Sequence, residues 1–200
     1  MGRIVHGNKN FGYAPINVSE QGEYSFGDVV MLPGMVSSSM SVEQEDNSIY
    51  ADDKTYCIIK GAKIRNLEVT LRHIPASYAA FLGFKINENG MLTDTGIFPN
   101  HCLFFESEEE DCDTGEATTT LHYLYNVKGG EPSRDTQTDE EEVDAQDITV
   151  TYGCMDSAFV VDDDNTPVQY AYVTRTAANA ATYDTFTEAI LTPSTTFTSY

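Results

Sequence analysis

The stretch Leu121-His122-Tyr123-Leu124-Tyr125-Asn126-Val127-Lys128 indicates the fold most clearly. Its odd-numbered positions are all apolar, and they share one face of an extended strand because successive side chains of a strand point to opposite faces. Residues 66–72 (NLEVTLR) and 148–152 (ITVTY) show the same alternation. The sequence therefore predicts strands that each bury one face.

Further stretches carry weaker strand patterns, and a helix interrupts them. The strand candidates are residues 11–18, 29–32, 35–45, 102–105 and 169–174. Pro75 suits the first turn of a helix, where its missing N–H is no loss, and Gly83 suits the left-handed residue that ends one. A second helix is expected over residues 177–191, although its threonines disfavour it. We therefore expect a mainly β fold, a β-sandwich or open barrel with one short packed helix.

Two long polar segments lie between these elements. Residues 107–117 (SEEEDCDTGEA) separate two strand candidates and are interpreted as a hairpin loop. Residues 129–147 form a longer loop, and loops of that length in a compact domain are usually functional or ordered by a partner. The Ser/Thr-rich tail from Thr192 is expected to be a mobile terminus.

The charge balance excludes several partners. The chain has 32 acidic and 11 basic residues among 200, a formal net charge of −21. Residues 106–164 hold 19 of the acidic residues and only two basic ones, whereas residues 54–85 hold six basic residues and only Glu68. Nucleic-acid affinity comes mainly from Lys and Arg, and anionic membranes attract the same residues. We therefore expect a chain that binds neither DNA nor a membrane.

Length and cysteine use bound the class of protein. A chain of 200 residues allows one sizeable domain, or a domain with a small appendage. The four cysteines lie far apart, without the spacing of a zinc or redox motif. No signal peptide or transmembrane segment is visible. We expect an intracellularly made, soluble protein whose thiols are reduced.

The sequence carries no enzyme signature. The adjacent pair His101-Cys102 is the nearest approach to a catalytic dyad, but neighbours in a strand point to opposite faces. The better interpretation places His101 at a strand edge and buries Cys102. Asp162-Asp163-Asp164-Asn165 could offer oxygen ligands to Ca²⁺, yet it lacks the glycine and distal glutamate of an EF-hand loop. A turn between Val161 and Pro167 explains these residues more simply, and we expect no catalytic residue, cofactor or metal.

Several stretches, in this order and spacing, resemble the major tail proteins of long-tailed bacteriophages, which are the subunits of the tail tube. The resemblance covers roughly residues 5–155 and is carried by several weak motifs together. They are residues 7–14 (GNKNFGYA), 49–53 (IYADD), 67–71, 74–83 (IPASYAAFLG), 87–92 (NENGML), 101–105, 121–128, 136–143 (TQTDEEEV) and 147–152. The central segment 108–113 is more acidic here than is usual in that family.

The resemblance implies a structural, non-enzymatic virion protein of a siphophage. Subunits of this kind assemble into rings, usually hexamers, which stack into a hollow tube around a tape-measure protein and contact other tail proteins. The genome leaves through the lumen without specific binding, and an acidic wall would repel its phosphates. Residues 1–155 are expected to form the tail-tube β-sandwich domain. Residues 156–200 match nothing in the family and form a C-terminal extension, with a possible strand and helix, that acts as an arm or a mobile tail.

The resemblance also points to a contact between subunits. We expect the loop 45–56 to reach the adjacent ring. The contact residues are Tyr50, Ala51, Asp52 and Asp53. The basic stretch 54–85 could face an acidic loop of a neighbour. Which acidic residues line the lumen stays open, since either face of each strand could do so.

Two alternatives remain at this point. One keeps the fold and makes the chain a tube subunit of a contractile injection or type VI-like system. The other is a Ca²⁺- or carbohydrate-binding β-sandwich module, which would be a stable monomer.

Overall fold

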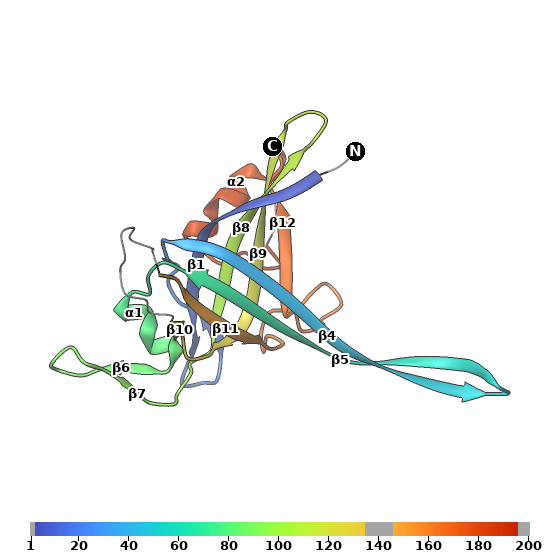
Figure 1. Ribbon diagram of the computed structural model, residues 1–200, viewed down its shortest axis with the longest axis horizontal. Coiled ribbons are helices and arrows are strands. Elements are labelled where there is room, and N and C mark those ends of the chain that lie inside the picture. Colours follow the sequence, from blue (N-terminus) through green and yellow to red (C-terminus); the bar gives the residue numbers. More distant parts are fainter. Residues whose placement is uncertain (1–2, 135–145, 196–200) are drawn as a thin grey trace, which may run out of the picture.

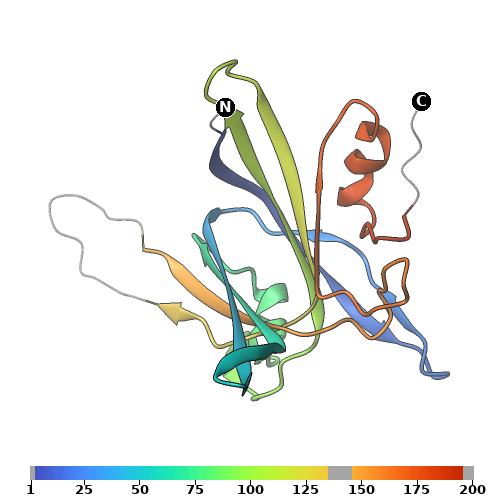
Figure 2. The ribbon, with the colours of Figure 1, turned by 90° about the vertical axis from the view of Figure 1, so that its right-hand side faces the viewer.

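The computed structural model describes residues 3–134 and 146–195 (Figures 1 and 2). The fold is mainly β, as the sequence predicts. Its strands are β1 (Arg3–Val18), β2 (Tyr24–Phe26), β3 (Val30–Met31), β4 (Met35–Ala51), β5 (Lys54–Leu71), β6 (Phe84–Ile86), β7 (Leu92–Asp94), β8 (His101–Asp111), β9 (Ala117–Gly129), β10 (Ser133–Arg134), β11 (Ile148–Cys154) and β12 (Tyr170–Thr174). Its helical segments are α1 (Ala76–Ala79), η1 (Ala80–Leu82), α2 (Ala180–Tyr183) and η2 (Asp184–Thr187).

Ten strands form one open sheet. Seven of them follow the order β2-β1-β8-β9-β11-β5-β4, and outside this path β3 pairs with β1, β10 with β11 and β12 with β9. The remaining pair, β6 and β7, forms a small hairpin. Strand β9 is the branch point: one edge pairs with β8, and the other pairs with β12 over residues 120–124 and with β11 over residues 127–129. The sheet bends until β4 approaches β1, where Ser38 Oγ donates a hydrogen bond to Asn8 Oδ1 (3.4 Å). The sheet nevertheless ends at β4, so it is an open barrel with unpaired edges.

Two hydrophobic cores lie on opposite faces of β8 and β9. The first core lies between β1, β8 and β9 on one side and β5 and β11 on the other, and α1 and η1 contribute Tyr78 and Leu82 to it. The second core lies between the opposite face of β8 and β9 and the C-terminal segment, which adds Tyr183, Phe186 and Leu191. β8 and β9 are therefore covered on both faces, which a strict apolar–polar alternation does not indicate.

Strand β9, which contains residues 121–128, shows this burial of both faces. Leu121, Tyr123 and Tyr125 share one face as predicted and enter the second core. Leu124 lies opposite and is fully buried in the first core. Val127 also enters the first core, because a register shift between the pairs His101–Val127 and Leu103–Leu124 changes the side to which β9 presents its side chains.

The helix after Pro75 is confirmed, and it ends at Gly83 in the left-handed conformation (φ 87°). The second helix is much shorter than the expected 177–191. It begins after Asn179, whose side-chain oxygen accepts a hydrogen bond from the backbone N–H of Thr176 (2.7 Å), and its last turn is 3₁₀. Threonines are poor helix formers, and packing onto the second core holds this segment instead.

The prediction of a hairpin loop over residues 107–117 is wrong. Strand β8 continues to Asp111 and the turn occupies only residues 112–116. The acidic side chains are accommodated in a strand because β1 brings basic ones beside them: Lys9 pairs with Glu108, Arg3 with Glu109 (3.8 Å) and His6 with Glu110 (3.4 Å). Charge complementarity across the strand pair offsets the repulsion that suggested a loop.

The other two polar segments are described only in part. In the expected loop 129–147, Gly129 ends β9 and β10 pairs with β11, and residues 135–145 lie outside the described residues. Of the expected mobile tail, residues 196–200 also lie outside them. Within residues 156–195, β12 pairs with β9 and the helical segments cover the second core, so this part of the C-terminal extension packs on the sheet.

Candidate assembly surfaces

β4 and β5 continue far beyond the body of the protein as a two-stranded arm (Figure 1). Its tip is a two-residue turn in which Asp52 (φ 51°) and Asp53 (φ 57°) both adopt the left-handed conformation, the combination that matches the twist of a hairpin. The expected loop 45–56 is therefore wrong as a loop, because the strands extend to Ala51 and from Lys54. Tyr50, Ala51, Asp52 and Asp53 are exposed at its end.

The arm exposes apolar side chains that nothing in the described chain covers. Its exposed large apolar residues are Val42, Ile49, Tyr50, Tyr56, Ile58, Ile59 and Ile64. An isolated two-stranded hairpin is only marginally stable in water, and exposed apolar patches mark surfaces that contact another molecule. The arm is therefore the strongest candidate for a contact surface.

The basic stretch 54–85 is distributed between the arm and the body. On the arm, Lys60 Nζ lies 3.0 Å from Asp46 of the facing strand. At the base of the arm, Arg65 turns to the body, where its guanidinium lies 4.6 Å from the centre of the Tyr170 ring and donates a hydrogen bond to Gln169 Oε1 (3.1 Å). Arg72 pairs with Asp147 (2.7 Å). The structure does not bring these cations together into one basic patch.

The solvent face of β4, β5 and β11 is polar and rich in hydroxyl groups. Three rows of directly opposed residues cross it: Ser37, Thr70 and Thr149; Ser39, Glu68 and Thr151; Ser41, Asn66 and Gly153. The alternating rows, such as Met40, Leu67 and Tyr152, point into the first core. We call the three outward rows the hydroxyl face. It bears no basic residue, and Glu68 is its one carboxylate.

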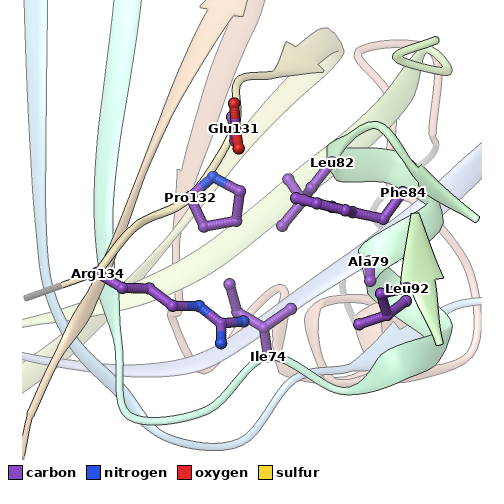
Figure 3. A pocket seen from close by; sticks show the side chains of 8 residues that line it. All are labelled: Ile74, Ala79, Leu82, Phe84, Leu92, Glu131, Pro132 and Arg134. Atoms are coloured by element: carbon purple, nitrogen blue, oxygen red, sulfur yellow. The ribbon is translucent and has the colours of Figure 1, made fainter. Parts of the chain in front are cut away.

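At the end of the molecule away from the arm, α1, η1, β6 and β10 surround an apolar pocket of about 420 Å³ (Figures 1 and 3). Its lining residues are Ile74, Ala79, Leu82, Phe84, Leu92, Glu131, Pro132 and Arg134. Figure 3 shows Glu131 and Arg134 beside the aliphatic and aromatic side chains of the other elements. Both charged residues are exposed, so the pocket combines an apolar interior with one acidic and one basic group.

The residues considered for chemistry have structural roles. His101 is fully buried rather than placed at a strand edge: Nδ1 lies 3.1 Å from the Pro99 carbonyl oxygen and Nε2 lies 3.0 Å from Tyr78 Oη. Burial lowers the pKa of His101 to about 4, so the ring is neutral at pH 7. Cys102 is buried on the opposite face, and burial raises the pKa of its thiol well above the usual value. The two side chains lie in different cores and do not form a dyad.

The acidic segment at residues 162–165 forms the turn that the simpler interpretation predicts. Val161 pairs with Pro167, and Asp162 Oδ1 accepts hydrogen bonds from the backbone N–H groups of Asp164 (3.0 Å) and Thr166 (2.8 Å). In residues 3–134 and 146–195, no three His, Cys, Asp or Glu side chains are grouped closely enough to hold a metal ion.

Sequence reasoning missed both the hydroxyl face and the pocket. The serines of VSSSMS (36–41) and the threonines of ITVTY carry a signal for the face, since two strands with polar outward positions pair through a third. The pocket has no such signal, because its lining comes from four separate stretches of the chain.

An open sheet with two different edges, an exposed apolar arm and a polar outer face are typical of a structural β protein that contacts other chains. The model of the phage tail tube protein family matches residues 2–199, and this chain belongs to that family. The match extends through residues 156–199, so the expectation that this part matches nothing in the family is wrong. The chain is accordingly a structural component of the phage tail, present in the virion, that assembles with itself and with other tail proteins.

The chain is also similar to a subunit of a solved assembly. In a cryo-EM structure of the extended sheath–tube complex of an extracellular contractile injection system (PVC), one chain is similar with a TM-score of 0.45 and 8% sequence identity. The similarity covers 83% of this chain and 89% of that one. No curated protein matches the sequence. Within residues 3–134 and 146–195, no helix has the length and apolar character needed to span a bilayer.

Proposed function

We propose that this chain is the tail tube subunit of a long-tailed, non-contractile phage, a siphophage. Copies form rings, six to a ring, and the rings stack around a tape-measure protein into a conduit through which DNA later leaves. The observation that carries this proposal is the hydroxyl face, because its three rows hold no cation that would attract DNA phosphates. With Glu68 as its one carboxylate, this face is less acidic than the wall that the resemblance implies.

The layers of the protein support a radial order for the tube wall. The hydroxyl face lies on one side of the first core, and the C-terminal segment lies beyond the second core, on the far side of β8 and β9. We place the hydroxyl face toward the lumen and residues 156–195 toward the outside. Of the expected tail-tube domain, the described residues 3–134 and 146–155 then form the wall, and residues 156–195 cover it.

The sheet edges support ring formation. At one end of the sheet order lies β4, and at the other end lie β1 and β2. The two ends approach each other at Ser38 and Asn8, but among the described residues no strand pairs with the outer edge of β4. Exposed edges are templates for pairing with another chain. Because these two edges differ, edge-to-edge pairing is heterologous, the kind of contact that closes into rings when the rotation per subunit permits.

Charge makes stacking dependent on salt. A ring of six copies carries 6 × −21 = −126 formal charges, and repulsion between exposed charges is screened beyond about 8–10 Å at physiological ionic strength. Apolar contacts of the arm, including the exposed Tyr50 ring and Ala51, would oppose the repulsion, and Asp52 and Asp53 lie beside them at the tip. We propose these residues as the contact between adjacent rings.

The test is electron microscopy of purified protein at high concentration, in low and in high salt, with a variant lacking residues 49–54. The proposal expects rings or hollow tubes that become more abundant as salt rises, and only single rings or monomers from the deletion variant. An unchanged unfolding temperature would show that this variant is folded, since the arm lies outside both cores. Tubes of normal length from the deletion variant would refute the contact assignment.

A further inference from the structure

The apolar pocket is suited to an aromatic side chain from another protein chain. At about 420 Å³ it lies within the range of pockets that hold small-molecule ligands, so a single aromatic ring with flanking groups fits. Among its lining residues, Leu92 has 42% of its surface exposed and Leu82 only 1%. The lining therefore runs from an exposed leucine to a buried one.

The arm tip carries the complementary groups. Ile49 pairs with Cys57 and Tyr50 with Thr55, so Tyr56 is the extra residue of a bulge and is 78% exposed. A bulge re-aims a side chain away from the regular pleat. Within four residues of this ring lie the carboxylates of Asp52 and Asp53 and the ammonium group of Lys54. The tip therefore presents one aromatic ring with both signs of charge beside it.

The positions of tip and pocket favour association between copies. The arm leaves one end of the long axis of the molecule, and α1, β6 and β7 lie at the other end (Figure 1). One copy cannot place its own tip in its own pocket without dismantling the fold. Contact between unlike surfaces at opposite ends is heterologous, and it propagates from copy to copy.

We propose that the arm tip of each copy enters the pocket of a second copy in the assembly. The Tyr56 ring fills the apolar interior, the carboxylates of Asp52 and Asp53 face Arg134, and Lys54 faces Glu131. The inference rests on the self-assembly in the proposed function and adds the receptor for the arm. Buried aromatic side chains at the centre of an interface commonly dominate its affinity, and the flanking charges fix the orientation.

Disulfide trapping tests the contact directly. Cys57 and Cys112 are exposed, so both are first replaced by serine. Thr55→Cys with Leu92→Cys, which keeps the Tyr56 ring, should then give a ladder of covalent multimers under mild oxidation, because Thr55 is exposed beside Tyr56 and a disulfide needs Cβ atoms about 3.8 Å apart. Thr55→Cys with Tyr172→Cys is the matched control, since Tyr172 is also exposed (66%) but lies on β12, away from the pocket. The control pair should give no ladder.

Electron microscopy of the same samples separates the two proposals. Rings or tubes without a ladder, or an equal ladder from the control pair, would overturn the arm–pocket contact and leave the proposed function standing. A chain that stays monomeric under every salt and concentration would overturn both.

A second measurement uses single substitutions. Tyr56→Ala should raise the protein concentration needed for assembly by about 30-fold or more, the size expected for a residue that dominates an interface. Tyr172→Ala should leave it unchanged. Arg134→Glu should also weaken assembly, and combining it with Asp52→Lys and Asp53→Lys should restore part of the loss. Equal effects of the two tyrosine substitutions, or the absence of any rescue, would count against the contact.

Discussion

Tyr183 donates a hydrogen bond from its hydroxyl group to Glu106 Oε1 over 2.6 Å, and this bond joins the C-terminal segment to the middle of β8. Both residues are buried. The other carboxylate oxygen of Glu106 accepts a hydrogen bond from the side chain of Asn10 in β1. One buried carboxylate thus ties three distant parts of the chain together.

Tyr183→Phe should loosen the C-terminal segment. A hydrogen bond to a charged group contributes about 1.5–3 kcal/mol, and its loss leaves a buried carboxylate oxygen unsatisfied. We expect the free energy of unfolding to fall by that amount, with faster hydrogen exchange over residues 170–191. Tyr172→Phe, at an exposed ring, is the control and should change neither. Unaltered exchange in the Tyr183 variant would show that the bond does not hold the segment.

Gly12→Ala should destabilise the fold. A Cβ at this position would overlap the Phe104 ring and lie 2.9 Å from the carbonyl oxygen of Val30. Overpacking of this kind costs about 1–3 kcal/mol, which denaturant unfolding measures. Gly153→Ala is the matched control, because no atom lies within 4 Å of its Cβ position. Equal stability of the two variants would contradict the packing of β1 on β8.

Acid should destabilise the protein through His101. Burial lowers its pKa to about 4, whereas the unfolded chain binds a proton near pH 6.5. The unfolded state therefore binds more protons between these values, so stability falls as the pH drops from 6.5 to 4, by about 3 kcal/mol from this residue. Comparison of the unfolding free energy at pH 7 and pH 4.5 should show a smaller loss in His101→Gln than in the parent. The exposed His73→Gln should keep the full loss, and identical pH dependence in all three proteins would refute the assignment.

Glu68→Lys should make the conduit retain DNA. The substitution puts one cation per subunit at the centre of the hydroxyl face, and Lys side chains bind phosphates with strong salt dependence. Assembled tubes of this variant should bind short DNA at low salt and release it at high salt. Glu188→Lys makes the same charge change on the exposed C-terminal segment, on the other side of the wall. DNA bound to tubes of this variant should remain accessible to nuclease, whereas DNA held in the lumen by the Glu68 variant should be protected. Nuclease-sensitive DNA on both variants would contradict the lumen assignment.

Sequence patterns predicted the individual strands and helices better than they predicted which segments pair with one another. The alternation in residues 66–72 and 148–152 and the Pro75–Gly83 helix are intrinsic to short stretches, and the structure confirms them. The acidic run after Glu106 was interpreted as a loop because the basic residues that offset its charge lie about 100 positions earlier, in β1. The pocket depends on four separated stretches. Only long-range pairing reveals such features, and no local pattern encodes it.

For the contact residues at the tip of the arm, too, the local motif was predictive and the strand pairing was not. The motif IYADD identified the tip of the arm, but the length of the arm follows from the pairing of β4 with β5 over residues whose alternation is weak. Tyr56 was assigned to the end of a loop, and only the strand register reveals it as a bulge residue.

The measurement that tests the account most directly is a cryo-EM reconstruction of tubes assembled from the purified chain. We expect stacked rings with a hollow centre, in which Ser39, Glu68 and Thr151 line the lumen and the segment with Tyr183 lies on the outer surface. A reconstruction with the hydroxyl face buried between subunits or turned outward would contradict the account, as would assemblies without a central channel.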